Sequence, residues 1–322
     1  MSVLTQKHFH NEPAAYAFVE AHVWPDGRVC PHCGVVDESG PLKGNSTRLG
    51  VYKCYACRKP FTVKVGTIFE SSHVKLHVWL QAIFLLSSSK KGMSSNQLAR
   101  TLEITLKSAW FLSHRIREAM RDGRLGPLGG AGMVVEADET YHGKMDNPPT
   151  MRVDGKPLAK KRHNRRPIIA LVERGGRVRS FHVEHADKVT VAGIVANNIR
   201  HESRLHTDES RLYKGAAGMF AEHSTVNHSS GEYARGDVNT NSAEGYFSIF
   251  KRGMRGIYQH CSEKHLHRYL SEYDFRYNHR VALGVNDEAR AVKALKGVVG
   301  KRLTYRTVGG RNARKETQGP QA

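Results

Sequence analysis

The sequence lacks any hydrophobic run long enough to cross a membrane. Its longest apolar stretch, residues 76–86, is interrupted by His77 and Gln81, whereas a spanning helix needs about 20 mostly apolar residues. The first residues also lack the apolar core of a secretory signal peptide. We therefore expect a cytoplasmic protein.

Acidic residues are also scarce. The 322 residues include 30 Asp and Glu against 50 Lys and Arg, which gives a formal net charge of +20. This imbalance predicts a polyanionic partner, and charge alone does not distinguish nucleic acid from an anionic membrane. The length allows a sizeable core divided over two or three units.

Cysteine is rare, with only five in the chain, and four of these form two Cys-x-x-Cys pairs. Cys30 and Cys33 make the first pair and Cys54 and Cys57 the second, with 20 residues between the pairs. Four thiolates at this spacing predict a tetrahedral Zn²⁺ site of the ribbon type. The alternative, disulfide bonding, is disfavoured in a cytosolic chain. Four protein ligands leave no open position for catalysis, so the predicted zinc is structural, and Cys261 remains as an isolated thiol.

Residues 67–125 carry a helical pattern. A short helix capped by Ser94 or Ser95, followed by a longer one over residues 106–121, predicts a helix-turn-helix, whose second helix enters the major groove of DNA. The turn lacks the glycine that is common in this motif, and plain helical packing is the alternative. The residues of the second helix that we expect to contact base or phosphate are Lys107, His114 and Arg115.

From residue 133 the pattern changes to strands and helices in the order of an RNase H-like domain. The glycine-rich stretch 126–132 predicts a hinge-like linker before it, and Gly175-Gly176 predicts a hairpin. The expected elements are strands 133–141, 167–173, 177–184, 204–207 and 225–227, with helices 188–200, 210–222, 241–252 and 262–280.

These patterns together predict a multidomain α/β (α+β) chain. An N-terminal zinc ribbon and a helix-turn-helix precede an RNase H-like catalytic domain. The predicted boundaries are 1–25 for a helical lead-in, 26–66 for the ribbon, 67–125 for the helix-turn-helix region, 126–132 for the linker, 133–283 for the catalytic domain and 284–322 for a mobile basic tail.

Three carboxylates fall where this topology would bring them together. Asp138 lies in the first strand, Asp208 follows the fourth, and Glu244 lies on a later helix. Three converging acids repel one another unless divalent cations lie between them. A pair of such ions is how many phosphoryl-transfer sites are built.

Neighbouring acids leave alternatives open. Glu136 shares a strand face with Asp138 and is an additional candidate ligand, whereas Glu139 and Glu209 fall on the opposite strand faces and are weaker candidates. Ordinary solvated carboxylates remain the alternative for any three acids chosen among 30.

The segment between the first two strands, residues 151–166, is strongly basic, with Asp154 as its single acid. Beside an acidic site, such a loop predicts contacts with phosphates, and a merely solvated loop is the alternative. The residues that we assign to DNA here are Lys160, Lys161, Arg162, Arg165 and Arg166.

Several of these motifs resemble bacterial insertion-sequence transposases of the DDE type related to the Merlin elements. The resemblance rests on the ribbon cysteines, Glu-Ala-Asp-Glu-Thr around Asp138, Thr-Asp-Glu-Ser around Asp208, and Asn-Ser-Ala-Glu-Gly-Tyr-Phe around Glu244. Residues 258–278 also resemble the family's closing block, and the similarity covers residues 15–280.

The resemblance implies an RNase H-like fold, catalysis with two Mg²⁺ ions, and double-stranded DNA of terminal inverted repeats as substrate. It implies that Asp138, Asp208 and Glu244 bind the metal and that Lys251 contacts DNA near the reacting phosphate. Asn241 is an alternative third ligand, because some family members carry Asn instead of the third acid. A nucleoid-associated protein that pairs two DNA ends is also expected to act as a homodimer or higher oligomer.

Two other functions stay open at this point. A zinc-ribbon and helix-turn-helix regulator would bind DNA without catalysis, but it would have no reason to keep three acids beside a polyanion. A tyrosine recombinase would use Tyr305 with His265 and Arg268, a pattern that arises easily by chance among 19 His and 50 Lys and Arg.

Overall fold

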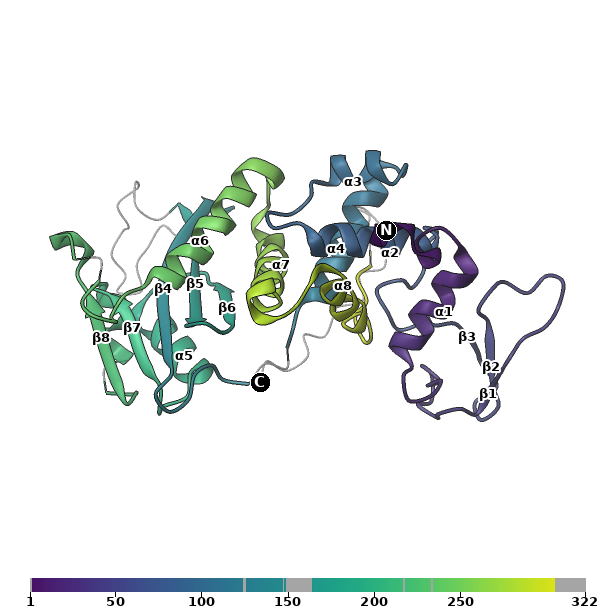
Figure 1. Cartoon of the computed structure of the whole chain (residues 1–322), viewed down its shortest axis with the longest axis horizontal. Helices are drawn as coiled ribbons and strands as arrows, with labels where there is room; N and C mark the ends of the chain where they lie inside the picture. Colours follow the sequence, from purple (N-terminus) through teal and green to yellow (C-terminus); the bar gives the residue numbers. More distant parts are fainter. Residues whose placement is uncertain are drawn as a thin grey trace.

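The computed structural model describes residues 2–123, 126–146, 148, 164–216, 218–232 and 234–304. Figure 1 shows an elongated molecule with a sheet at one end, the N-terminal strands at the other and a group of helices between them. Within the described ranges, no helix is long and apolar enough to cross a bilayer. Four of the residues with predicted roles lie outside these ranges: Lys160, Lys161, Arg162 and Tyr305.

The N-terminal region consists of short helices and a small antiparallel sheet. Asn11 caps α1 by accepting a hydrogen bond from a backbone amide at 2.9 Å, a role that this residue type favours. Tyr52 of the sheet donates to Glu20 of α1 at 2.8 Å, so helix and sheet pack together. The elements are 3₁₀ turns Val3–Thr5 and Lys7–Phe9, α1 (Glu12–Val23), β1 (Ser39–Pro41), β2 (Tyr52–Cys54) and β3 (Pro60–Phe61).

Helices α2 (Leu76–Ser88), α3 (Ser95–Thr101) and α4 (Leu106–Met120) confirm the helices predicted in this region. Ser94 and Thr105 cap α3 and α4 by accepting bonds from backbone amides. In the turn between them Glu103 has a φ of 52°, the left-handed conformation that glycine commonly provides. The turn between these two helices therefore forms here without glycine.

The prediction of a mobile tail from residue 284 is wrong for its described part. Helix α8 (Asp287–Lys296) packs against α1 and α2. Ala294, Leu295 and Val298 are buried in the same core as those helices. Short apolar side chains at helical spacing form a buried stripe between the basic residues, so this segment belongs to the helical region near the N-terminus.

The second half of the chain forms a five-stranded mixed sheet in the order β6-β5-β4-β7-β8. The central strand β4 pairs antiparallel with β5 and parallel with β7. β6 is antiparallel to β5, and β8 is parallel to β7. The strands are β4 (Val134–Lys144), β5 (Arg165–Glu173), β6 (Val178–His182), β7 (Arg204–Asp208) and β8 (Glu222–Val226), which confirms all five predicted strands.

Helices cover both faces of this sheet. α5 (Lys188–Asn198) packs on the face that carries Val135 and Ala137. α6 (Asn241–Gly253) and α7 (Leu266–Asn278) pack on the face that carries Ile168. Strand order, strand direction and helix placement together make this an RNase H-like domain. Its shorter turns are Arg211–Ala216, His228–Ser230, Glu263–His265 and Val281–Leu283, all 3₁₀, and the π-helical turn Met254–Tyr258.

Two predicted segments differ in the structure. The stretch 126–132 is not a hinge, because Leu128 is buried and pairs with Ile199, and the Gly129 amide donates to Glu173 at 2.9 Å. The helix expected over residues 210–222 is reduced to the 3₁₀ turn Arg211–Ala216, and the last residue of the expected range, Glu222, already belongs to β8.

A buried charge network joins the helical region to the sheet domain. Glu272 of α7 is fully buried and accepts from Arg117 of α4 at 2.7 Å and from Arg276 at 2.6 Å. The hydroxyl of Tyr258 donates to the same carboxylate at 2.5 Å. Because removing one partner of a buried ion pair is strongly destabilising, this network fixes α4 relative to α7.

Candidate active site and metal centre

Two of the predicted acids meet at the ends of neighbouring parallel strands. Ala137 of β4 lies opposite Thr207 of β7, so the next residues, Asp138 and Asp208, lie side by side on one face of the sheet. Their carboxylate oxygens lie within 4.8 Å of each other. The register of β4 with β7 therefore produces the convergence that the topology predicted.

Glu139 is a third member of this cluster. One of its carboxylate oxygens lies within 4.8 Å of those of Asp138 and Asp208, although strand alternation points it to the other face. The hydroxyl of Ser210 donates to its Oε1 at 3.1 Å, and the buried hydroxyl of Tyr213 lies beside the same carboxylate. Sequence reasoning ranked Glu139 as a weak candidate, because alternation alone does not show where the neighbouring strand ends.

Burial and mutual repulsion raise the pKa values of these acids. Burial, followed by the charges of Glu139, Asp208 and Glu244, raises the pKa of Asp138 to about 7. Burial and Asp208 likewise raise the pKa of Glu139, and burial raises that of Asp208. A divalent cation between the oxygens would favour the charged forms. Carboxylate oxygens are the ligands that Mg²⁺ prefers, so this donor set fits that ion.

Glu244 lies beside the cluster, in the first turn of α6. Its side chain is 50% exposed, and its Oε1 lies 3.6 Å from Nε2 of His228. Its charge contributes to the raised pKa of Asp138, so it is close enough to act on the cluster. His228, on the turn after β8, was not identified from the sequence, which has no local signal linking it to the acids. Asn241 is exposed at the start of α6.

Glu136 holds α6 in place. Its fully buried carboxylate accepts from the amides of Ser242 at 2.7 Å and Ala243 at 3.1 Å, and from Arg174 at 2.9 Å. The first amides of a helix have no intrahelical partner and favour a negative charge. Glu136 therefore positions the helix that carries Glu244, and these partners occupy both of its oxygens.

Glu209, beside Asp208, is also engaged elsewhere. It accepts from the amides of His228 at 2.9 Å and Ser229 at 3.0 Å. Its carboxylate thus holds the turn that carries His228, which agrees with its ranking as a weaker candidate ligand.

Three of the predicted DNA-contacting residues have accessible positions. Lys251 lies on α6, two turns after Glu244, with its Nζ 5.9 Å from the ring centre of Phe247. Arg165 is exposed at the start of β5, and Lys107 is exposed at the start of α4. Lys251 and Arg165 thus lie on elements of the sheet domain, and Lys107 on the second helix of the helix-turn-helix.

His114 and Arg115 are buried in α4, which argues against the predicted contact with DNA. His114 is 1% exposed and packs against the ring of Trp110, and burial, followed by Arg117, lowers its pKa to about 2. Arg115 is 3% exposed and donates to the backbone carbonyls of Glu70 and Leu303. Helical periodicity alone does not reveal these distant partners.

Arg166 is also buried, unlike its neighbour Arg165. It is 5% exposed and donates to the carbonyl of Cys261 at 2.5 Å and to Asp146 at 3.1 Å. These contacts give it a structural role in tying β5 to the segment before α7.

The residues of the recombinase alternative also serve packing. Arg268 donates to Glu118 of α4 at 2.5 Å. His265 lies against the rings of Trp110 and His114. Both side chains therefore belong to the interface between α4 and α7.

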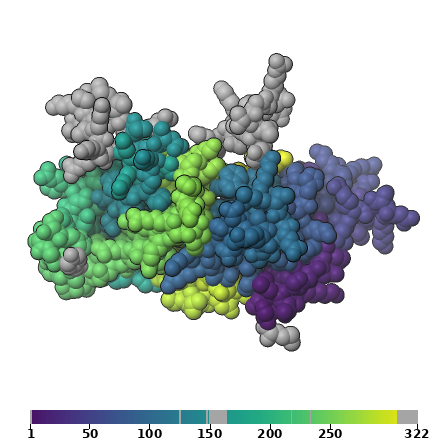
Figure 2. Space-filling view, turned by 90° about the horizontal axis from the view of Figure 1, so that it is seen from above, coloured from purple at the N-terminus to yellow at the C-terminus, as the bar shows by residue number. Residues whose placement is uncertain are grey.

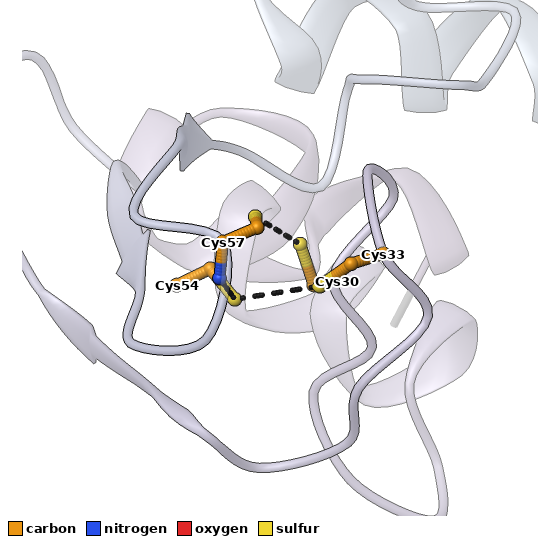
Figure 3. A group of neighbouring side chains, drawn as sticks. All are labelled: Cys30, Cys33, Cys54 and Cys57. Carbon is orange, nitrogen blue, oxygen red and sulfur yellow. Dashed lines mark hydrogen bonds between the residues drawn. The ribbon is translucent and has the colours of Figure 1, made fainter.

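The four paired cysteines converge from two loops, as Figure 3 shows. The Sγ atoms of Cys30 and Cys57 are 3.7 Å apart, as are those of Cys33 and Cys54. A tetrahedral zinc with Zn–S bonds of about 2.3 Å spaces its sulfurs about 3.8 Å apart, whereas a disulfide brings them to about 2.05 Å. The geometry therefore fits a metal-binding cluster and excludes disulfides in this arrangement.

Comparison with known proteins finds a family match in each half of the chain. Residues 127–278 match the ISXO2-like transposase domain, and residues 10–60 match a transposase zinc-ribbon domain. An uncharacterized protein in transposable element ISH50 of Halobacterium salinarum is 27% identical over 283 residues, which cover 84% of this chain and 92% of that protein. A chain in a pre-cleavage Mos1 transpososome aligns at 14% identity and a TM-score of 0.28, over 67% of this chain and 74% of that one. A similarity that low carries no argument.

Proposed function

This chain belongs to the ISXO2-like family of insertion-sequence DDE transposases, and we propose that it cleaves DNA at the ends of its own element and joins them to target DNA. The observation that carries this proposal is the acidic cluster on the central strands. Asp138, Glu139 and Asp208 lie together with raised pKa values, in a chain whose net charge of +20 suits a polyanionic substrate.

We assign metal binding to Asp138, Asp208 and Glu244. Two Mg²⁺ ions held there would lower the pKa of the attacking water or DNA 3′-hydroxyl. They would also neutralise the charge that develops on the leaving oxygen. A cation between these acids would lower their raised pKa values, because it offsets both the cost of burying the charges and their mutual repulsion. Glu139 is a further candidate ligand, since one of its carboxylate oxygens lies within 4.8 Å of those of Asp138 and Asp208. Glu136 positions Glu244 by capping α6.

We assign DNA binding to the basic residues around this cluster and to the helix-turn-helix. Lys251 lies on the same helix as Glu244, two turns further on, and would contact a phosphate next to the one that reacts. The zinc ribbon would bind the terminal inverted repeats of the element, and Lys107 would contact a phosphate at their end. Because two ends must be paired before they are joined, we expect a homodimer or higher oligomer on DNA.

The test is cleavage and strand transfer on DNA that carries the flanking ends of the protein's own gene, with and without Mg²⁺. Omitting Mg²⁺ is preferable to adding EDTA, because a chelator also competes for zinc held by cysteines. We expect Mg²⁺-dependent cleavage, lost in Asp138→Asn, with DNA binding kept or strengthened because a charge that repels phosphate is gone.

The matched control is Glu202→Gln, which removes an exposed acid from the turn before β7 and should cleave like the wild type. If the wild type binds these ends but does not cleave them with any divalent metal, the proposal fails in favour of a DNA-binding regulator. Equal loss of binding and cleavage in Asp138→Asn would contradict the role assigned to Asp138.

A further inference from the structure

A groove of about 780 Å³ lies between the helix-turn-helix and the end of α6. One wall comes from residues 94–97 and the start of α4, and the other from residues 256–260. Figure 1 shows α3 and the end of α6 on the same side of the molecule, and Figure 2 shows the corresponding blue and light-green surfaces next to each other. The chemistry assigned to the acidic cluster does not use this groove.

The composition of the groove suits a nucleic acid. None of the described residues that line it is acidic, and Lys107 and His260 are basic. Asn96, Gln97 and Gln259 add side-chain amides, which can donate and accept hydrogen bonds and so pair with the edges of bases. The basic residues therefore suit the phosphates of a nucleic acid, and the amides suit the edges of its bases.

Trp110 offers an aromatic surface at the wall of this groove. The residue is 37% exposed, although its ring is held 4.3 Å from the ring of His114 and 5.6 Å from that of His265, measured between centroids. Leu106, one turn earlier, is 51% exposed. A fixed and partly exposed indole is the kind of platform on which a nucleobase stacks.

The groove admits something smaller than a double helix. Nine residues of α4 are buried, so only its first turns, with Leu106, Lys107 and Trp110, are open. Residues 256–260 stand opposite these turns, and an α-helix needs the whole of a major groove about 12 Å wide. A volume of this size lies in the range of small-molecule pockets, which suits one or two nucleotides.

The opposite wall contains a strained residue. Gln259, which ends the π-helical turn, has a φ of 56° and a ψ of −53°. Residues other than glycine adopt positive φ only where the surrounding structure imposes it, and such positions concentrate at binding sites. Here this conformation lies at the edge of the groove, next to His260.

The groove also lies just beyond the end of α6, the helix that carries Glu244 in its first turn. α6 continues directly into the π-helical turn, so Glu244 and Ile257 are separated by about 20 Å at a rise of about 1.5 Å per residue. Lys251, Arg252 and Arg255 lie between them. At about 3.4 Å per base along a strand, this distance corresponds to about six nucleotides.

We propose that this groove binds an unpaired nucleotide of single-stranded DNA, with its base stacked on Trp110. The base edge meets the amides of Asn96 and Gln259, and Lys107 pairs with the phosphate. That the strand comes from an element's end rests on the proposed function; the binding of an unpaired nucleotide does not.

The first experiment uses the wild-type protein and a short single-stranded oligonucleotide that carries 5-iododeoxyuridine. After irradiation, the cross-linked peptides are identified by mass spectrometry. We expect cross-links within residues 94–110 or 256–260. Cross-links that map only elsewhere overturn the proposal, and because the protein is unaltered, misfolding cannot explain such a result.

The second experiment compares Trp110→Leu with Trp110→Phe, which are both apolar and differ in whether an aromatic face remains. With a fluorescent oligothymidylate, we expect the leucine variant to bind roughly ten-fold more weakly, the size of one base–aromatic stacking interaction. The phenylalanine variant should lose about three-fold or less, and neither should lose affinity for a short duplex. Wild-type affinity of Trp110→Leu, or equal losses in both variants, would refute stacking on Trp110.

The outcome is independent of the proposed catalysis. A protein that cross-links in the groove but never cleaves DNA would keep this inference and lose the proposed function. A protein that cleaves with Mg²⁺ but cross-links elsewhere would do the reverse.

Discussion

Replacing Asp138 by Asn tests the raised pKa of this acid without any DNA. In the folded protein, burial and then Glu139, Asp208 and Glu244 raise the pKa of Asp138 to about 7, whereas an Asp in an unfolded chain has a pKa of about 3.9. The native state therefore binds this proton more tightly than the unfolded state. The resulting stability is complete below the unfolded pKa and is lost as the pH rises through about 7.

The size of the effect follows from the two pKa values. Between about pH 5 and pH 7 each pH unit changes the free energy of unfolding by about 1.4 kcal/mol. Acidification from pH 8 to pH 5 should therefore stabilise the wild type by about 3 kcal/mol through Asp138 alone. Asn does not titrate, so Asp138→Asn should not gain this stability on acidification. Its free energy of unfolding relative to the wild type should therefore fall by about 3 kcal/mol from pH 8 to pH 5.

The assay is urea unfolding in Mg²⁺-free buffer at several pH values between about 5 and 8, with Glu202→Gln as control. Adding Mg²⁺ at about pH 8 should stabilise the wild type by preferential binding to the folded state and should leave Asp138→Asn unchanged. Parallel pH dependence in wild type and Asp138→Asn would refute the raised pKa of Asp138. Equal stabilisation of both proteins by Mg²⁺ would refute a cation bound at Asp138.

Three further substitutions test other parts of the molecule. Glu272→Gln leaves two buried guanidinium groups without their carboxylate and should cost about 3–5 kcal/mol in urea unfolding; a change below about 1 kcal/mol would contradict the network. Leu295→Ala should cost about 2–5 kcal/mol, because Leu295 is 1% exposed; no effect would mean that α8 is a loose tail after all. Cys54→Ser should remove bound zinc, measured by metal analysis, and abolish recognition of specific DNA ends; unchanged zinc content would refute the ribbon's metal site.

The sheet domain could be predicted because its signals are local. Short apolar runs and turn residues define each strand, and the order of strands and helices then fixes the topology. Asp138 and Asp208 followed from that topology, since neighbouring parallel strands end at the same edge. Glu139 did not follow, because its approach to the cluster depends on β7 ending at Asp208 and on the Ser210 hydroxyl that binds its carboxylate.

The helical region was less predictable because its partners are distant in sequence. Basic side chains on an amphipathic helix are expected in solvent, yet Arg115 donates to the carbonyl of Leu303, 188 residues away. His114 is covered by the ring of His265 from the segment before α7. The core partners of α8 are equally distant in sequence, because Ala294 and Leu295 pack with residues of α1 and α2.

The structure distinguishes acids that need a cation from acids that do not. Although burial raises the pKa of Glu272, Arg276 and Arg117 hold it below its ordinary value, so this fully buried carboxylate is neutralised by the protein itself. Asp138 and Glu139 have no such cationic partner among the causes of their shifts, and their pKa values are raised. A buried charge without compensation is expensive, and protonation or a bound cation are the two ways to relieve it. A bound cation would favour the ionised carboxylates at neutral pH, and for this reason the metal that we propose lies at this cluster rather than at Glu272.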